Sequence, residues 1–170
     1  MYHLRAARSG DLPGLLQLLA AADLPRVGVA ERLEAFLVVE ADGRVVGCAG
    51  LEAYGEVGLL RSVCVDPAHR GCGLGERLVR AALARGRETG VQEVVLLTTT
   101  AAPYFWRLGF CEVDRDSLDP RVQASPECRE GCCASATAMH LRLDEKWDER
   151  RSSTLNEKQG SRVRGEEVGR

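Results

Sequence analysis

Apolar positions recur with two different periods along residues 1–143. Short apolar or alternating segments bounded by turn residues predict strands over residues 2–7, 36–40, 45–54, 60–65, 94–98, 110–113 and 136–143. Stripes with a spacing of three or four residues predict long helices near 11–22 and 73–88, and shorter ones at 31–35 and 102–108. The order of elements is therefore βααβββαβαββ, which indicates an α/β (α+β) protein.

The stretch from Leu60 to Arg85, LRSVCVDPAHRGCGLGERLVRAALAR, joins a strand to a helix through a glycine-rich loop. Glycines let the backbone curl with its amides inward, and the helix N-terminus adds positive charge, so this corner predicts a phosphate site. It is not a Walker loop, because Gly75 is followed by Glu76-Arg77 instead of Lys and Ser or Thr. Its glycine order also differs from that of the dinucleotide fingerprint.

Length and composition narrow the classes of function. The 170 residues, 45% hydrophobic and 28% charged, suit one soluble domain with an appendage. A net charge of −2 argues against nucleic-acid binding, and the lack of a run of about twenty apolar residues argues against a membrane span. The N-terminus has no continuous apolar signal region, so we expect a cytoplasmic protein whose seven cysteines are reduced.

The character of the chain changes at Asp144. Residues 144–170 mix charges of both signs with Ser, Asn, Gln and Gly, and they hold few apolar side chains. Such a segment buries too little apolar area to offset the entropy lost on ordering. We therefore predict a folded domain over residues 1–143 and a flexible charged tail over residues 144–170, whose removal should leave folding nearly intact.

Two motifs together resemble one enzyme superfamily. LLRSVCVDPAHRGCGLG at residues 59–75 and LTTTAAPYFWRLGF at residues 97–110 resemble the GNAT N-acetyltransferases, over about Leu4 to Leu143. The resemblance implies the GNAT fold, with flanking helices and a mixed central sheet that splays apart beside the V-x-V strand. It also implies that the strand backbone pairs with the pantetheine arm of acetyl-CoA and that the loop amides bind its pyrophosphate. The residues concerned are Val63, Cys64, Val65, Arg70, Gly71, Cys72, Gly73, Leu74 and Gly75.

Within the superfamily, both motifs are most similar to the arsenic-resistance-associated N-acetyltransferases, which in turn resemble the acetyltransferase module of N-acetylglutamate synthases. This resemblance implies acetyl transfer from acetyl-CoA to the amino group of a small amino-acid-like substrate, including arsenic- or phosphorus-containing glutamate analogues. It implies no metal cofactor, and it leaves a homodimer open. Two other functions stay open: a non-catalytic acetyl-CoA-binding sensor, and a resistance protein that binds a metalloid through cysteines.

Acetyl transfer to an amine needs a base for the ammonium, a donor for the oxyanion and a proton source for the departing thiolate. The family resemblance places the oxyanion donor at a backbone amide near Val63. Many GNAT enzymes carry a tyrosine acid at the position that Phe105 occupies here. The candidates left to protonate the thiolate are Tyr104, Thr98, Thr99 and water.

Charged residues around the central strand supply the remaining candidates. Glu52 is the candidate base, with Glu56 as the alternative. Arg61 is the candidate substrate residue, because a guanidinium in an apolar strand needs either a bound carboxylate or an internal partner. The internal partner would be Glu52 or Glu56, so both roles of Arg61 stay open. Thr99 is a second candidate substrate contact.

Three cysteines near the end of the domain form a C-x3-C-C pattern, Cys128, Cys132 and Cys133. Three thiolates suit a soft ion, but this spacing is not a standard zinc signature and no second ligand pair lies nearby in the sequence. We expect ordinary thiols near the substrate mouth and no metal site, with metalloid ligation as the alternative.

Overall fold

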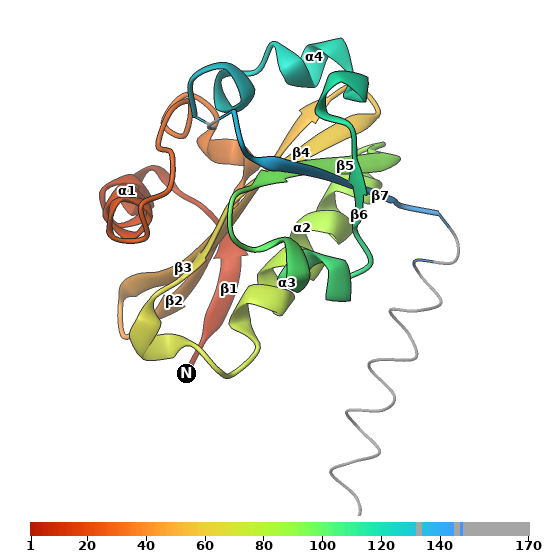
Figure 1. Ribbon diagram of the computed structural model, residues 1–170. Coiled ribbons are helices and arrows are strands. Elements are labelled where there is room, and N and C mark those ends of the chain that lie inside the picture. The colour runs from red at the N-terminus through yellow and green to blue at the C-terminus, as the bar shows by residue number, and fades with distance from the viewer. Residues whose placement is uncertain (132–133, 145–146, 148–170) are drawn as a thin grey trace, which may run out of the picture.

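A seven-stranded sheet with helices on both faces forms the protein (Figure 1). The computed structural model describes residues 1–131, 134–144 and 147. The strands are β1 (His3–Ala6), β2 (Phe36–Ala41), β3 (Arg44–Tyr54), β4 (Val57–Val65), β5 (Glu93–Thr98), β6 (Cys111–Val113) and β7 (Thr137–Arg142). The helices are α1 (Leu12–Ala21), α2 (Leu74–Glu88), α3 (Ala102–Arg107) and α4 (Pro120–Gln123), and one π-helical turn spans Glu127–Gly131.

The strands lie in the order β1-β2-β3-β4-β5-β7-β6, and neighbouring strands are antiparallel except β4 and β5, which are parallel. The predicted mixed sheet with flanking helices is therefore confirmed. The turn between β2 and β3 lies at Asp42 and Gly43, with φ of +50° and +74°. Two consecutive residues with positive φ are typical of a type I′ turn, whose backbone twist matches the right-handed twist of the two flanking strands.

Two short elements differ from the sequence prediction. The helix predicted at residues 31–35 is only a 3₁₀ turn, Leu33–Ala35. Helix α4 was not predicted, although Asp119 precedes Pro120 and its side chain accepts a hydrogen bond from the Arg121 amide at 2.8 Å. A helix of four residues shows too little periodicity to stand out in a sequence, so only its cap could have indicated it.

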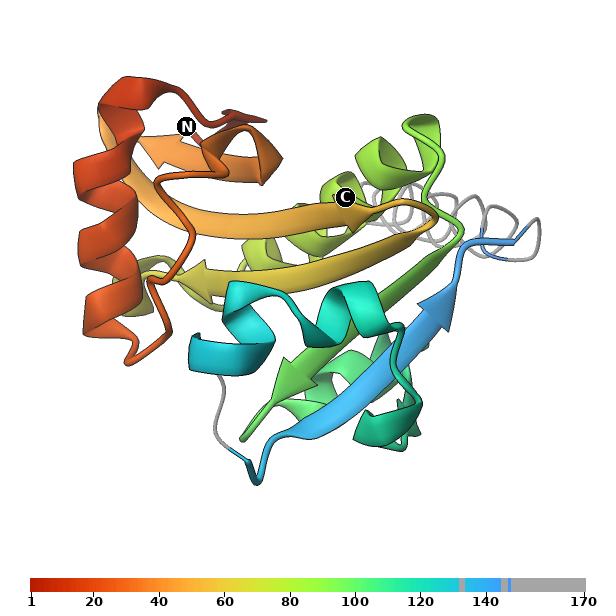
Figure 2. The ribbon, with the colours of Figure 1, turned by 90° about the horizontal axis from the view of Figure 1, so that it is seen from above.

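Alternating side chains on the strands build a core on each face of the sheet. On β2, Leu37 and Val39 belong to the larger core, whereas Phe36 and Val38 belong to a second core. Helix α2 packs on the larger core, and α1 packs on the second. A third, small cluster joins Leu59 of β4 to α4. Figure 2 shows α1 and α4 at different positions along the long β3–β4 hairpin.

Strands β4 and β5 pair over a short distance only. Their ladder has three residue pairs, from Val57 with Glu93 to Leu59 with Val95. Beyond Leu59 the two strands separate, whereas β4 stays paired with β3 as far as Val65. The splay predicted beside the V-x-V strand is present, and it creates the space in which the site lies.

A β-bulge in β4 lies at the start of this separation. The register with β3 shifts between Cys48, which pairs with Cys64, and Gly50, which pairs with Arg61. Ser62, inside the shift, has φ of +58°, a left-handed conformation that non-glycine residues rarely adopt. Such a conformation persists only where surrounding contacts hold it.

The folded core extends beyond the predicted boundary at residue 143. Trp147 is 3% exposed and belongs to the larger core, and its amide donates to the Asp144 carbonyl oxygen at 3.0 Å. Arg87 near the end of α2 also donates to the Asp144 carbonyl oxygen, at 3.0 Å. Deletion from residue 144 would therefore remove a core side chain, contrary to our expectation. The rest of the predicted tail, residues 145–146 and 148–170, lies outside the described residues.

We predict that Trp147→Ala lowers the free energy of unfolding by about 3 kcal/mol, because a large buried side chain is replaced by a cavity. Urea unfolding followed by circular dichroism measures this. Trp106→Ala is the matched control, since Trp106 is 71% exposed and should change stability little. Equal losses in the two variants would show that Trp147 is not part of the core.

Candidate active site

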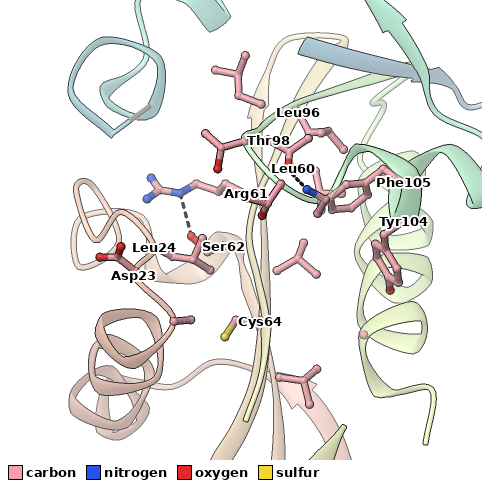
Figure 3. Close-up of a pocket in the computed structure, with 18 of the residues that line it drawn as sticks. Asp23, Leu24, Leu60, Arg61, Ser62, Cys64, Leu96, Thr98, Tyr104 and Phe105 are labelled. Atoms are coloured by element: carbon pink, nitrogen blue, oxygen red, sulfur yellow. Dashed lines mark hydrogen bonds between the residues drawn. The ribbon is translucent and has the colours of Figure 1, made fainter. Parts of the chain in front are cut away.

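A cleft of about 1000 Å³ opens where β4 and β5 separate. Residues 60–65 of β4 and residues 96–101 at the end of β5 line it along its length. One end, which we call the loop side, is bounded by residues 70, 71 and 73–76 and by Tyr104. The other end, the α1 side, is bounded by residues 22–25 and Glu127. Figure 3 shows β4 between these two sides, with Arg61 pointing away from Tyr104.

The glycine loop presents open backbone to the cleft. Gly71 and Gly73 have φ of +85° and +78°, which glycine adopts without strain. A Cβ at either position would meet no atom within 4 Å, and α2 begins immediately after Gly73. Free backbone beside the N-terminus of a 15-residue helix suits a pyrophosphate, so the residues present fit the coenzyme implied by the sequence.

The loop residues predicted to bind the coenzyme do not all face the cleft. Those that line it are Arg70, Gly71, Gly73, Leu74 and Gly75. Cys72 is not part of the lining, and its exposed thiol donates to the His69 carbonyl oxygen at 3.2 Å. The predicted role of the Cys72 backbone amide stays a prediction. Arg70 fixes the loop to the strand, because its Nε donates to the Val65 carbonyl oxygen at 2.9 Å.

The three strand residues predicted to hold the pantetheine arm, Val63, Cys64 and Val65, all line the cleft. Val63 and Val65 are partly buried and pack against the larger core. Cys64 lies in the second core, and burial raises the pKa of its thiol. A thiol with a raised pKa stays neutral at pH 7, so Cys64 acts here as an apolar wall residue.

Tyr104 and Phe105 occupy different environments although they are adjacent in α3. Phe105 is 7% exposed and packs edge-on against Phe110, with ring centroids 5.7 Å apart. The Tyr104 hydroxyl makes no hydrogen bond to a described residue and lies beside α2, where a Cβ on Gly75 would be 3.0 Å from it (Figure 3). Burial raises the Tyr104 pKa, so the hydroxyl carries its proton at neutral pH.

The threonines at the end of β5 both reach the cleft. Thr98 also has a structural role, because its Oγ1 accepts a hydrogen bond from the Ala101 amide at 3.0 Å, just before α3 begins. Thr99 is exposed in the lining. The structure therefore brings Thr98, Thr99 and Tyr104 to one cleft, as predicted, and leaves their chemical roles as predictions.

Arg61 is 3% exposed and lies in a dense set of contacts on the α1 side. Its Nη2 is 3.0 Å from Glu127 Oε2, and its Nη1 is 3.5 Å from Glu52 Oε1. Nη1 also donates to the Val27 carbonyl oxygen at 2.7 Å, and Nε donates to Ser62 Oγ at 3.1 Å. The sequence suggested Glu52 or Glu56 as the internal partner of Arg61, and the structure pairs Arg61 with Glu52.

Glu52, the predicted base, lies outside the cleft lining. It is 1% exposed, and its carboxylate is 3.7 Å from Arg32 as well as 3.5 Å from Arg61. These contacts favour a structural role, and the catalytic role stays a prediction. Among the described residues, the carboxylates that line the cleft are Asp23, Glu76 and Glu127.

Sequence reasoning missed the acidic residues of the α1 side. Glu127 stands beside Cys128 in a stretch whose chemistry we read from its cysteines, and no periodic pattern marks it as buried. Asp23 directly follows the apolar stripe of α1 and has φ of +57°. An aspartate at the end of a helical stripe is a signal for a left-handed helix end, which would have placed Asp23 at a turn.

The predicted cysteine loop can be followed only in part. Cys128 is half-buried, and burial raises the pKa of its thiol. Cys132 and Cys133 lie outside the described residues. Within the described ranges, no three His, Cys, Asp or Glu side chains are grouped to hold a metal ion.

In the described part of the chain, no helix combines the length and the apolar character that a membrane crossing needs.

Known proteins are similar to this chain in sequence and in fold. The sequence model of the acetyltransferase (GNAT) family matches residues 12–110. The amino-acid acetyltransferase of Ralstonia nicotianae is 34% identical over 125 residues, which are 68% of this chain and 28% of that protein. The amino-acid acetyltransferase of Pseudomonas putida is 33% identical over 130 residues, 71% of this chain and 30% of that protein. The chain thus spans less than a third of either relative.

Solved structures agree with the sequence relatives. N-acetylglutamate synthase from Neisseria gonorrhoeae, complexed with coenzyme A and L-arginine, superposes with a TM-score of 0.72 and 24% identity over 85% of this chain and 34% of that one. Rv2747 from Mycobacterium tuberculosis, in complex with CoA, superposes with a TM-score of 0.72 and 26% identity over 84% of this chain and 99% of that one. The chain belongs to the acetyltransferase (GNAT) family.

Proposed function

We propose that this protein is an N-acetyltransferase that moves an acetyl group from acetyl-CoA to the amino group of an amino acid or an amino-acid-like molecule. The observation that carries the proposal is the cleft between β4 and β5, which is continuous from the open glycine loop to the α1 side. A long acetyl donor can enter the cleft from the loop side, and a small amine can bind at the α1 side. Family membership and the amino-acid acetyltransferase relatives support the same reaction.

The coenzyme fits the loop side of the cleft. Gly71 and Gly73 would leave their backbone free for the pyrophosphate, and the first turn of α2 adds the positive end of its dipole. Val63 and Val65 would border the pantetheine arm where β4 has lost its pairing with β5. Bound there, acetyl-CoA supplies an activated acyl group whose thiolate leaves readily.

The chain's own groups would then serve the transfer. After the ammonium has lost one proton, the amine nitrogen bonds to the acyl carbon; the C–S bond then breaks, the nitrogen loses its second proton and the sulfur takes one proton. A backbone amide near Val63, beside the bulge at Ser62, would donate to the oxyanion. On the α1 side, Asp23 or a water would receive the ammonium proton. Glu52 is less suited to this role, because its carboxylate lies outside the cleft lining and pairs with Arg61. Tyr104, Thr98 or water would supply the proton to sulfur.

The proposal predicts thiol release from acetyl-CoA on addition of an amine. Incubation of the protein with acetyl-CoA, a thiol reagent and a panel of amino acids should identify an acceptor, with N-acetyl product confirmed by mass spectrometry. The panel includes glutamate and its arsenic- and phosphorus-containing analogues, the finer substrates that the sequence resemblance predicts. Tight acetyl-CoA binding without turnover of any amine would contradict the proposal and favour a coenzyme-binding sensor.

Gly73→Ala should weaken CoA binding by about tenfold or more, because a Cβ would occupy the space that the pyrophosphate needs. Gly43→Ala is the matched control. Gly43 has φ of +74°, close to the +78° of Gly73, and a Cβ there would also meet no protein atom within 4 Å. Both variants should lose similar unfolding free energy, about 1 kcal/mol.

Isothermal titration calorimetry with CoA and urea unfolding measure the two effects separately. Only Gly73→Ala should lose affinity. If CoA affinity is unchanged in Gly73→Ala, or falls equally in Gly43→Ala, the loop is not the pyrophosphate site.

Tyr104→Phe distinguishes two roles for the Tyr104 hydroxyl. Because this hydroxyl lies beside Gly75 in the first turn of α2, we expect the variant to raise the KM for acetyl-CoA severalfold and to change kcat little. Steady-state kinetics with the acceptor identified above would measure both. A fall in kcat of about 100-fold at unchanged KM would instead assign the general acid to Tyr104.

A further inference from the structure

One buried guanidinium connects three parts of the chain that are far apart in sequence. Arg61 of β4 contacts Val27 and Pro25 in the loop after α1, through their carbonyl oxygens at 2.7 Å and 3.4 Å. It contacts Glu52 on β3 at 3.5 Å and Glu127 in the π-helical turn at 3.0 Å. The loop and the turn carry lining residues of the α1 side of the cleft, so Arg61 holds the walls of the acceptor end.

The two walls also approach each other closely around Arg61. A Cβ at Gly28, whose φ is +74°, would be 3.5 Å from Arg61 Nη1 and 3.6 Å from Pro126 Cβ. The loop and the residue before the turn therefore lie close together beside the guanidinium. Without the planar fork of Arg61, their inward-facing carbonyl and carboxylate groups would have to find other donors.

Arg61 also supports the bulge in β4. Its Nε donates to Ser62 Oγ at 3.1 Å, and the Cys48 thiol donates to the Ser62 carbonyl oxygen at 3.1 Å. Ser62 needs such contacts because its left-handed backbone is strained. The backbone that follows Ser62 lines the cleft between the two separated strands, so the same guanidinium acts on the acceptor walls and on the strand between them.

The Arg61 guanidinium already has carboxylate partners within the described part of the chain. Arg61 faces two carboxylates, Glu52 and Glu127, and Arg32 provides a second positive charge 3.7 Å from Glu52. The Arg61 side chain is 1% exposed. A substrate carboxylate that bound this guanidinium would compete with the Glu127 carboxylate, which already lies 3.0 Å from Nη2.

We infer that Arg61 is a positioning residue, not the carboxylate-binding residue that the sequence suggested: it clamps the loop after α1 and the Glu127 turn into one wall around the acceptor amine, and it holds the bulge that faces that wall. The kinetic consequence rests on the proposed N-acetyltransferase function. The clamp itself does not, because it can be observed in the protein without any substrate.

Hydrogen–deuterium exchange followed by mass spectrometry tests the clamp directly. In Arg61→Met, amides of residues 22–31 and of residues 125–131 should exchange about tenfold faster or more, because the first segment loses charged hydrogen bonds and the second loses its ion pair with Arg61. Glu127→Gln keeps the side-chain shape and should accelerate exchange in residues 125–131 alone. Exchange in α2 should be unchanged in both variants. Arg61→Lys should lie between wild type and Arg61→Met, since an ammonium lacks the fork.

Arg32→Met is the matched control. Arg32 pairs with the same Glu52 carboxylate, but it makes none of the contacts to Glu127, Ser62 or Val27 described for Arg61. If Arg32→Met reproduces the exchange pattern of Arg61→Met, the effect arises from uncompensated charge on Glu52 and the inference is wrong. Acceleration spread evenly over all segments of Arg61→Met, with no segment-specific change in Glu127→Gln, overturns it as well.

Kinetics with the identified acceptor then separate positioning from substrate binding. A clamp predicts a raised KM for the amine and a lowered kcat in Arg61→Met for amino acids and for simple amines without a carboxylate alike, with the KM for acetyl-CoA unchanged. Loss confined to acceptors that carry a carboxylate, at full rate for simple amines, would restore the substrate-binding role and overturn the inference. If wild type turns over no amine, the proposed function fails, and the exchange data still decide the clamp.

Discussion

The separation of β4 from β5 after three residue pairs is the constraint on which the site depends. A strand inside a sheet normally satisfies its backbone groups on both sides, and burying them without partners is costly. From Leu60 to Val65, β4 keeps only β3 as a partner, and the other side faces the cleft. A ligand arm with its own amides can complete that ladder. The same separation leaves room between the loop side and the α1 side, so it also sets the path between donor and acceptor.

Keeping two strands apart requires other contacts that hold each strand in place. On the larger core, α2 packs against β2, β3 and β4, which holds β4 rigidly on that face. On the opposite face, the Arg61 cluster takes this role where α1 has already ended. Breaking a buried ion pair by removing one partner typically costs about 3–5 kcal/mol. A charged cluster is thus a strong local constraint. Apolar side chains of the same volume could not replace it, because they have no donors for directional contacts to Ser62 and Glu127.

The family and the fold could be predicted from the sequence because both rest on local patterns. The glycine run at residues 70–75 and the threonine-rich segment at residues 97–100 are each a continuous stretch of sequence, so each motif can be recognised by itself. The acceptor end could not be predicted in the same way. It is assembled from residues near 25, 61 and 127, and no local period connects them. Arg61 stands out in the sequence because of its apolar surroundings, and Glu52 could be predicted as its partner, but only the fold shows that Glu127 is a second partner. Trp147 was missed for a similar reason, since a single aromatic residue in a charged segment gives no period.

This difference in construction bears on what can vary within the family. The loop side is built largely of backbone, at Gly71 and Gly73 and in the first turn of α2, so many side-chain changes elsewhere leave it intact. The α1 side is built of side chains on a loop and a short turn, which a few substitutions can reshape. A relative at 34% identity can therefore keep the donor site while its acceptor wall differs. Under the proposed function, the shape and charge that Arg61, Glu127 and Asp23 give to that wall would select the acceptor, and membership of the family alone would not.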